Sequence, residues 1–366
     1  MTIKELAYTA QQHLESITGR SFKRAHIYEL LASSFGFKSY AALCSDYVFT
    51  QRENDRSIPA QHQTILQKRV VELGYDPMAT DVAASAFLTF VSEQHIDVVG
   101  VADLVDGLSD DDSFSEEFWT SPDSGVYPPI LLESLEAKAS KGDHLAHYAL
   151  ALLFQTDDDD SSQEPGSDYW YLQEQQGRVL TGVEKEWANE HARHLEEAEK
   201  YTFHLREAGR LGNSSALLEL AALFHDASYF DAAKASGITD EPTSVAELAE
   251  SLGREEDAEY WLTVAAEAGD TDAMRRLIDD FEHGDVERSW MWFYLAEMLG
   301  TDLTKSHLQA FHEGGNQADE IYYDDVGGPI YVAGDEGAEL KPLDEEGKRE
   351  ARKRADMIFQ RIQQPI

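Results

Sequence analysis

Histidines at helical spacing are the residues of this chain with the clearest capacity for chemistry. His144 and His147 stand three residues apart, and "NEHARHLEE" contains Glu190, His191 and His194. On a helix each pair lies on one face, and two imidazoles with a carboxylate could bind zinc, as in a metal-dependent hydrolase. Neither stretch has a further ligand at a recognisable distance. We therefore interpret them as helix-surface histidines and expect no metal site and no cofactor.

Other catalytic motifs are absent from the sequence. It contains no Gly-x-Ser-x-Gly elbow, no phosphate-binding Gly…Gly-Lys-Ser/Thr loop, no Gly-x-Gly-x-x-Gly and no His-Glu-x-x-His. The aspartate runs Asp110–Asp112 and Asp157–Asp160 lack the glycine and the terminal glutamate of a calcium loop, which favours solvated acidic loops. Cys44 follows an apolar stripe and is typical of a small core residue. We expect no catalytic residue.

The net charge of −40, from 70 acidic and 30 basic residues, restricts the possible partners. It disfavours nucleic acids and anionic membranes. Residues 1–50 differ, because five bases and four acids give them a charge of +1. Lys23, Arg24, His26 and Lys38 could mark a DNA-reading helix-turn-helix, but the basic patch is thin. A basic protein is the expected partner.

The compartment is predicted from what the sequence lacks. The first 20 residues are amphipathic without a continuous apolar run, unlike a signal peptide, and no run is long enough to span a bilayer. The single cysteine excludes an intramolecular disulfide framework. We expect a cytoplasmic protein without a membrane partner.

The patterning predicts helices along most of the chain. Residues 3–46 favour short helices, with Ser39 as an N-cap. Further helices are expected at Gln61–Leu73, Thr80–Gln94 and Val98–Leu108. Two acidic stretches, residues 109–129 and 156–168, read as a linker and an insertion.

The C-terminal part begins with the one clear strand signal. "EIYYDDVGGPIYVAGDEGAEL" has β-branched and aromatic residues around Gly-Gly-Pro and predicts a small hairpin. The chain ends in an amphipathic helix. Its apolar stripe is formed by Ala351, Ala355, Ile358 and Ile362.

A repeat organises the central part of the chain. The segments "LEAKASKGDHLAHYALALLF", "LREAGRLGNSSALLELAALF" and "LTVAAEAGDTDAMRRLIDDF" align without gaps. The aligned residues are Leu135, Ala139, Gly142, Ala146 and Phe154 in the first copy; Leu205, Gly209, Gly212, Ala216 and Phe224 in the second; and Leu262, Ala266, Gly269, Ala273 and Phe281 in the third. "WMWFYLAEMLGTDLTK" is a weaker fourth copy.

The repeat has a physical explanation as the joint of a helical hairpin. Its glycine can end one helix in the left-handed conformation, and the next residue is suited to capping the following helix. Small residues on either side allow two helices to cross closely, and the phenylalanine lies about two turns beyond the alanine on the same face. A stack of such hairpins can bury faces that one hairpin leaves exposed.

The third copy resembles the Sel-one-like repeat family, which is related to tetratricopeptide repeats. "DAEYWLTVAAEAGDTDA" matches the family hallmark through Ala258, Trp261, Ala265, Ala266, Gly269 and Ala273. The resemblance covers roughly residues 131–311 and implies a right-handed α-solenoid that docks protein partners, with the last helix as its cap. The glycines are 70, 57 and 31 residues apart, so the first two intervals contain insertions or degenerate copies. The N-terminal "AHIYELLASSFGFKSYAAL" is similar to a small helical module of many bacterial proteins.

Residues two and six positions after the repeat alanine point away from the Ala–Phe face, at 100° per residue. They are Tyr148 and Leu152 in the first copy, Leu218 and Ala222 in the second, and Arg275 and Asp279 in the third. The charged residues of the third copy are typical of a solvated face. The apolar residues of the first and second copies indicate a surface that is covered. We favour the chain's own "DYWYLQ" (Asp168–Gln173) as the cover; a partner segment is the alternative. The candidate partner contacts are Tyr148, Leu152, Leu218, Arg275 and Asp279.

The expected fold class is all-α: an α-solenoid of Sel-one-like, tetratricopeptide-like hairpins with an N-terminal helical module and a small C-terminal β-hairpin. The expected domains are a module at 1–50, a helical middle region with an acidic linker at 51–130, the solenoid with acidic insertions at 131–311, and the hairpin with the capping helix at 312–366. The expected function is a non-catalytic protein-interaction adaptor. The alternatives are a cytosolic immunity- or antitoxin-type inhibitor, or a binder that imitates nucleic acid, either of which would mask a basic nuclease. A metal-dependent hydrolase is the further alternative.

Overall fold

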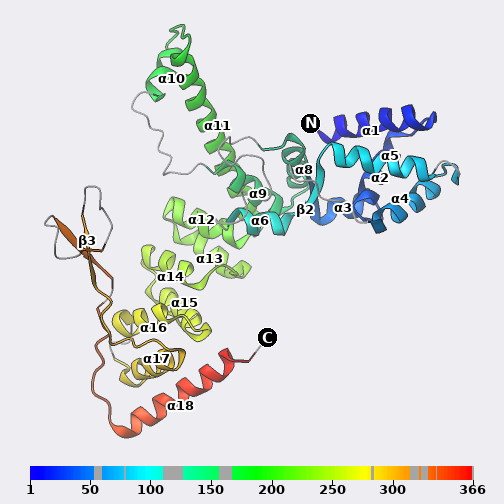
Figure 1. Ribbon diagram of the computed structural model, residues 1–366. Helices are drawn as coiled ribbons and strands as arrows, with labels where there is room; N and C mark the ends of the chain where they lie inside the picture. The colour runs from blue at the N-terminus through cyan, green and yellow to red at the C-terminus, as the bar shows by residue number, and fades with distance from the viewer. Residues whose placement is uncertain are drawn as a thin grey trace. The chain divides into compact units, whose positions relative to one another are not determined.

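The chain is mostly helical, with two small two-stranded sheets among the described residues (Figure 1). The computed structural model describes residues 1–52, 60–77, 80–109, 127–155, 167–281, 284–313, 321–322, 329–334 and 336–364. The predicted acidic linker and acidic insertion fall largely outside these ranges. Within them, no helix is both long enough and apolar enough to cross a membrane. The chain forms two compact units, Met1–Leu220 with Ala232–Gly237, and Ala221–Asp231 with Ile238–Ile366.

The N-terminal helices of the first unit share one hydrophobic core. They are α1 (Ile3–Thr18), α2 (Arg24–Ser34), α3 (Tyr40–Asp46), α4 (Ala60–Glu72) and α5 (Thr80–Glu93). Helix α1 packs on α2 and α5, and α2 packs on α4. Leu6, Phe49 and Phe87 are fully buried in this core, and Cys44 is half-buried against it. Residues from both sides of position 50 therefore build the same core. The expected N-cap of α3 is present, since Ser39 Oγ accepts a hydrogen bond from the Ala42 N–H at 3.1 Å.

A short antiparallel sheet, which the sequence pattern did not predict, closes this region. Strand β1 (Tyr47–Gln51) pairs with β2 (Ile96–Gly100), in a register that places Val48 opposite Val99. The predicted helix Val98–Leu108 is therefore wrong at its start, because α6 (Val101–Ser109) begins after β2. The cause is the β-branched run at Ile96–Val99, which pairs with a partner strand far away in the sequence.

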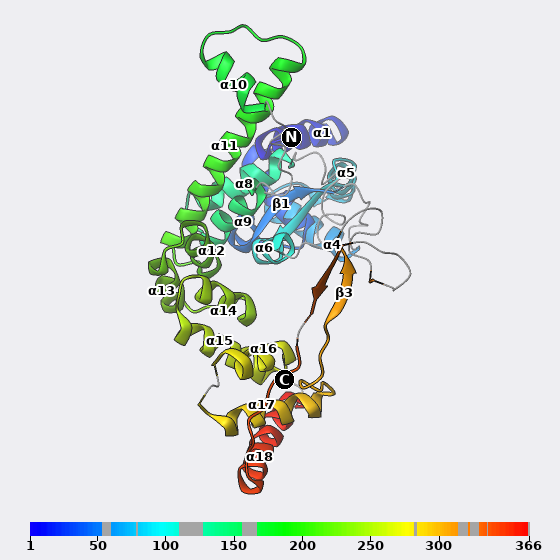
Figure 2. The same cartoon turned by 90° about the vertical axis from the view of Figure 1, so that its left-hand side faces the viewer.

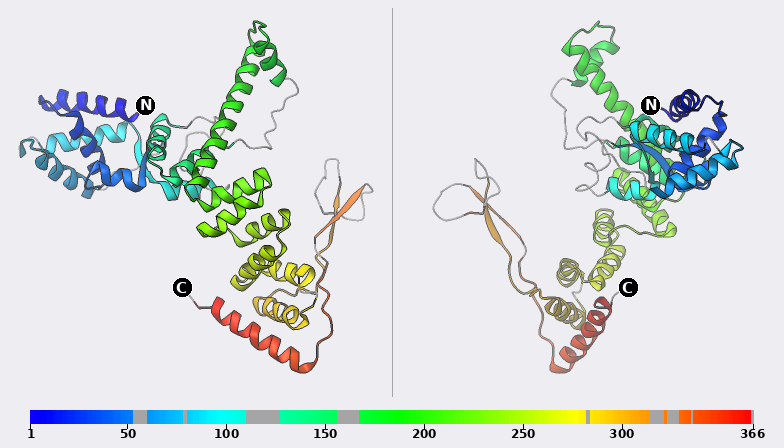
Figure 3. Two further views of the ribbon diagram at one scale, coloured as in Figure 1. Left: turned by 180° about the vertical axis from the view of Figure 1, so that it is seen from behind. Right: turned by 45° about the vertical axis from the view of Figure 1, so that its right-hand side comes forward.

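The remaining helices of the first unit include a long helical hairpin. In order they are α8 (Pro129–Ala139), α9 (His144–Phe154), α10 (Ser167–Gln175) and α11 (Val183–Arg210). The next two helices, α12 (Ser214–Phe224) and α13 (Ala227–Ser236), contribute residues to both units. Helix α9 packs against α6, α8 and α11, whereas α10 packs along α11. Figure 3 shows α10 and α11 side by side, joined by a tight connection.

Glycines turn the chain at the repeat joints. Gly142, Gly212 and Gly269 have φ angles of +86°, +92° and +110°. This is the left-handed conformation in which glycine is favoured. The residues that follow, Asp143, Asn213 and Asp270, each accept a hydrogen bond from a backbone N–H in the first turn of the next helix. The joint therefore has the local geometry that the repeat pattern predicts.

The repeat side chains are buried to different extents. Ala146, Ala216 and Ala273 have almost no exposed surface, and Trp261 is half-buried against the core of the second unit. Phe154 and Phe281 are half-buried, but Phe224 is 41% exposed. The expectation that each phenylalanine shares the buried alanine face is thus wrong for Phe224. Phe224 is the last residue of α12, and its ring centre lies 6.2 Å from that of Tyr229 in α13.

The second unit is a series of helices that each pack on a neighbour in sequence. They are α14 (Pro242–Ser251), α15 (Glu255–Ala268), α16 (Thr271–Arg276), the π-helical turn η3 (Leu277–Phe281), α17 (Val286–Leu299) and α18 (Glu345–Ile362). Figure 2 shows α14 to α17 following one another. Trp292 is fully buried in their core. Helix α18 packs on α17 and α15 and buries Ala351, Ala355 and Ile358, the predicted apolar stripe.

The second sheet differs in detail from the predicted hairpin. Strand β3 (Gln309–His312) pairs antiparallel with β4 (Ile330–Ala333). The second strand lies in the predicted stretch, but β3 precedes it. Residue Ile321, at the start of that stretch, makes only an isolated bridge to Phe311. Gly327 and Gly328, which were expected to form the turn, lie outside the described residues.

Candidate functional site

The α10–α11 hairpin carries the most distinctive surface of the first unit. Lys185 forms an ion pair with Glu174, and the Arg178 guanidinium lies 4.7 Å from the centre of the Trp170 ring. Tyr171 of α10 packs on His191 of α11, with ring centres 5.1 Å apart. These contacts hold α10 against the N-terminal half of α11.

A groove of about 780 Å³ runs along α11 and begins beside α10. Its lining residues are Tyr171, Ala192, Leu195, Glu196, Ala198, Glu199, Thr202, Phe203, Arg206 and Glu207. Two large apolar side chains in it are exposed, Leu195 by 43% and Phe203 by 58%. Side chains of this size are usually buried against something. The groove is therefore a candidate docking surface.

The periodicity of α11 explains why the groove forms on one side of the helix. Counting from Ala192, the positions three, seven, ten and fourteen residues later all line the groove. These are Leu195, Glu199, Thr202 and Arg206. These positions have heptad spacing and lie on one face of the helix, although Leu195 is the only large apolar residue among them. The opposite face of α11 is occupied within the chain, where the Tyr201 hydroxyl donates a hydrogen bond to Glu219 at 3.1 Å.

The groove has a net negative charge, since it is lined by three glutamates and one arginine. Lys200 lies 2.7 Å from Glu196 and lowers the pKa of that carboxyl, and hydrogen bonds from Arg210 lower the pKa of Glu207. Both carboxylates therefore remain ionised at neutral pH. Glu199 has no hydrogen bond or ion pair with any described residue and is exposed. It is the carboxylate most available to an external cation.

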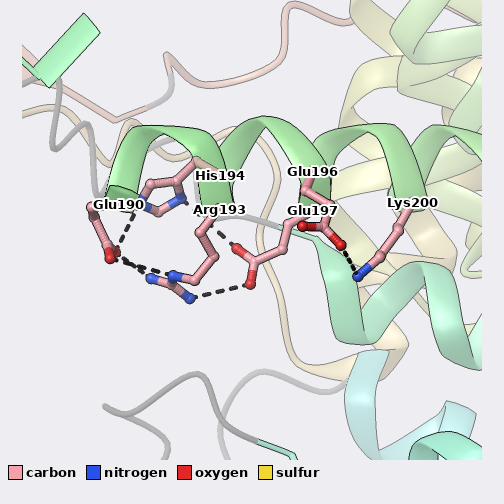
Figure 4. Close-up of polar contacts among 6 residues, drawn as sticks. All are labelled: Glu190, Arg193, His194, Glu196, Glu197 and Lys200. Atoms are coloured by element: carbon pink, nitrogen blue, oxygen red, sulfur yellow. Dashed lines mark hydrogen bonds and ion pairs between the residues drawn. The ribbon is translucent and has the colours of Figure 1, made fainter. Parts of the chain in front are cut away.

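Glu190 and His194, two of the three residues weighed as zinc ligands, belong to an ion-pair network on α11 (Figure 4). Arg193 forms a hydrogen-bonded ion pair with Glu190 and another with Glu197 at 3.1 Å. The hydrogen bond from Arg193 lowers the pKa of Glu190. His194 Nε2 lies 3.3 Å from the same Glu190 carboxylate, whereas His191 packs on α10. The described part of the chain contains no group of three or more side chains placed to hold a metal ion.

The other predicted histidine pair separates into two different environments. His144 Nδ1 lies 3.3 Å from the amide nitrogen of Asn213. His147 is buried, with Nε2 3.1 Å from the Ala139 carbonyl and Nδ1 3.0 Å from Nδ1 of His204. Since a carbonyl only accepts, Nε2 of neutral His147 carries the proton, and its Nδ1 accepts a hydrogen bond from the Nδ1–H of His204. The pair thus joins α9 to α11.

Burial affects the protonation of these two rings. It lowers the pKa of His147. It also lowers the pKa of His204, to about 4, with His147 and Lys200 contributing in the same direction. Both imidazoles are therefore neutral at physiological pH, which suits a structural hydrogen bond between helices.

The predicted partner contacts do not gather into one exposed surface. Tyr148 and Leu218 are buried, and Leu152 is half-buried. Asp279 is exposed, but Arg275 is buried and donates a hydrogen bond to the Glu336 carbonyl at 3.1 Å, so a solvated face at this position is the wrong interpretation. The segment that contains Glu336 lies over it.

The elements that cover Tyr148 and Leu152 in the first repeat copy are not the "DYWYLQ" segment that we favoured. Helix α9 is enclosed by α6, α8 and α11, whereas the "DYWYLQ" segment belongs to α10 and packs along α11. In Figure 1, α10 lies near the opposite end of α11 from α9. Elements that precede and follow the repeat copy therefore cover it.

The groove residues were not among the sequence-based candidates. A signal was present, because Leu195 and Phe203 interrupt a strongly charged helix. Comparisons with protein-family models, curated proteins and solved structures found no match.

Proposed function

We propose that this protein is a non-catalytic adaptor that binds a basic protein through the groove on α11. The observation that carries the proposal is that Leu195 and Phe203 are exposed in a groove also lined by ionised Glu196 and Glu207, and by Glu199, which has no partner among the described residues. Apolar side chains would supply the binding energy, and the carboxylates would select a cationic partner.

We also propose that residues 131–311 form a solenoid of Sel-one-like repeats, which acts as the scaffold. Left-handed glycines at the three joints and capping residues directly after them support this proposal. The packing of α14, α15, α16 and α17 each on the next is a second support. A stack of this kind needs a capping helix, a role that suits α18.

The charge of the whole chain favours the same kind of partner. With a net charge of −40, the protein would attract a basic partner at long range and repel acidic ones. A cytoplasmic location is part of this proposal. An immunity-type inhibitor of a basic nuclease would use the same physical interactions, and the identity of the partner separates the two functions.

The test is an affinity capture from native lysate with the full chain at 50 and 500 mM NaCl, followed by mass spectrometry. We expect one basic protein that is recovered at low salt and weakened at high salt. A captured nuclease, inhibited on binding, would favour the immunity function. Absence of any partner at either salt concentration would contradict the adaptor function.

A further inference from the structure

We propose that the groove on α11 binds an α-helix of the partner, with apolar residues at heptad spacing and a lysine or arginine opposite Glu199. This inference rests on the proposed function and specifies its binding site and the form of its partner. It follows from the shape of the groove, from its charge and from the charge of the acidic segment between α9 and α10.

The shape of the groove fits a helix. From Ala192 to Arg206 the helix rises about 21 Å, enough to contact about four turns of a partner helix. The small side chains Ala198 and Thr202 lie between the larger Leu195 and Phe203, and Ala192 precedes Leu195 by about one turn. This alternation leaves room between the large residues for side chains of a second helix. The Tyr171 ring lies at the end of the groove next to α10.

The charge of the groove determines the complementary residue. Glu199 lies at a central heptad position, where a polar side chain sets the register and the choice of partner. Glu196 and Glu207 have basic partners within the chain, and Arg206 also has an interaction partner. Glu199 alone among these charged residues has none with the described residues, so a cation of the incoming helix would pair with it.

The chain's own acidic insertion is a poor occupant. The segment between α9 and α10 contains Asp157–Asp160 and Glu164, and no lysine or arginine. Its charge would be repelled by the glutamates of the groove. A partner helix with a basic residue is therefore the better match.

The test uses two fluorescein-labelled helical peptides of three heptads each. Both carry leucine at every d position and at the two outer a positions, with balanced charges elsewhere. They differ only at the central a position, which is lysine in one peptide and glutamate in the other. Fluorescence anisotropy with the full chain should give a Kd at least tenfold lower for the lysine peptide. Glu199→Lys should reverse this preference, because it reverses the charge that selects the peptide.

A matched pair of aromatic substitutions controls for general hydrophobic binding. Phe203 in the groove is 58% exposed, and Tyr260 in the second unit is 59% exposed. Phe203→Ala should weaken binding of the lysine peptide at least tenfold, whereas Tyr260→Ala should leave it unchanged. Circular dichroism checks that each variant is folded.

The outcomes separate this inference from the adaptor function. The helix inference is wrong if neither peptide binds, or if Glu199→Lys and Phe203→Ala leave the affinities unchanged. If those variants still capture the basic partner from lysate, the adaptor function stands and its site lies elsewhere. Loss of capture without peptide binding would keep the groove as a site but reject a helix as its occupant.

Discussion

Lys138 is a buried cation with several partners in the first unit. Its side chain is 6% exposed, and its ammonium donates hydrogen bonds to the carbonyls of Cys44 and Ser45 at the end of α3. It also forms an ion pair at 3.2 Å with Asp143, the N-cap of α9. One side chain on α8 therefore joins two other helices, and its charge is compensated by carbonyls at a helix C-terminus and by a carboxylate.

Lys138→Met should destabilise the first unit by about 2 kcal/mol, because it leaves buried carbonyls without a donor. The matched control is Lys141→Met, which removes an exposed ammonium from the following turn and should change stability by less than about 0.5 kcal/mol. Urea unfolding of both variants measures the difference. Equal stability of the two variants would contradict a structural role for the Lys138 contacts.

The His147–His204 pair should make stability depend on pH. The pKa of His204 is lowered to about 4 in the folded chain, compared with 6.5 for the free side chain. Above pH 6.5 the ring is neutral in both states, and its contribution is fully present. Between pH 6.5 and about 4 the unfolded chain binds a proton that the folded chain does not, so stability is lost. Since the ring is about half-buried, the loss should be on the order of 1 kcal/mol.

The measurement compares the free energy of unfolding of the wild type with that of His204→Leu at pH 7.5, 6.0 and 4.5. The comparison is needed because other groups also titrate in this range. We expect the wild type to lose stability relative to the variant as the pH falls. A difference that stays constant over the three pH values would show that His204 does not cause the effect.

At the scale of elements, helices and their joints could be predicted, but pairings distant in sequence could not. A glycine followed by aspartate or asparagine determines its local conformation, so the joints at Gly142, Gly212 and Gly269 were visible in the pattern. Strands β1 and β2 have five residues each and are paired across more than 40 intervening residues. Such short segments have no periodicity that separates them from helix ends.

The groove could not be predicted for a related reason. It requires α10 to pack along α11, which sequence spacing does not determine. The pattern favoured the "DYWYLQ" segment as the cover of α9, with a partner segment as the alternative, and the contact candidates were the positions that point away from the Ala–Phe face. Tyr148 and Leu218 were correctly recognised as covered positions, but the chain's own helices cover α9.

Gly269→Ala tests the joint between α15 and α16. At φ +110° an alanine is strained, whereas the added methyl group would meet Ile362 and Leu299 only at ordinary contact distances. The expected loss is therefore a backbone effect of roughly 1–2 kcal/mol. Gly284→Ala is the matched control, because this glycine lacks a positive φ and has open space around it. Equal thermal stability of the two variants would contradict the role assigned to the joint.

At the scale of the whole molecule, the excess of acidic residues affects stability as well as binding. Several ion pairs among the described residues are exposed at both partners, as between Arg20 and Asp76, and such pairs contribute little. A net charge of −40 repels itself in the compact state more than in the extended one. Salt screens this repulsion over a Debye length of about 8 Å at physiological ionic strength.

Raising NaCl from 20 to 300 mM should therefore increase the unfolding temperature by about 2–4 °C, the shift that corresponds to roughly 1 kcal/mol in a unit of this size. Replacing Asp157–Asp160 by asparagine changes the net charge from −40 to −36. This variant should unfold at a higher temperature than the wild type in 20 mM NaCl and respond less to added salt. If salt instead lowers the unfolding temperature, attractive ion pairs outweigh the net repulsion, and the acidic surface serves stability rather than partner selection.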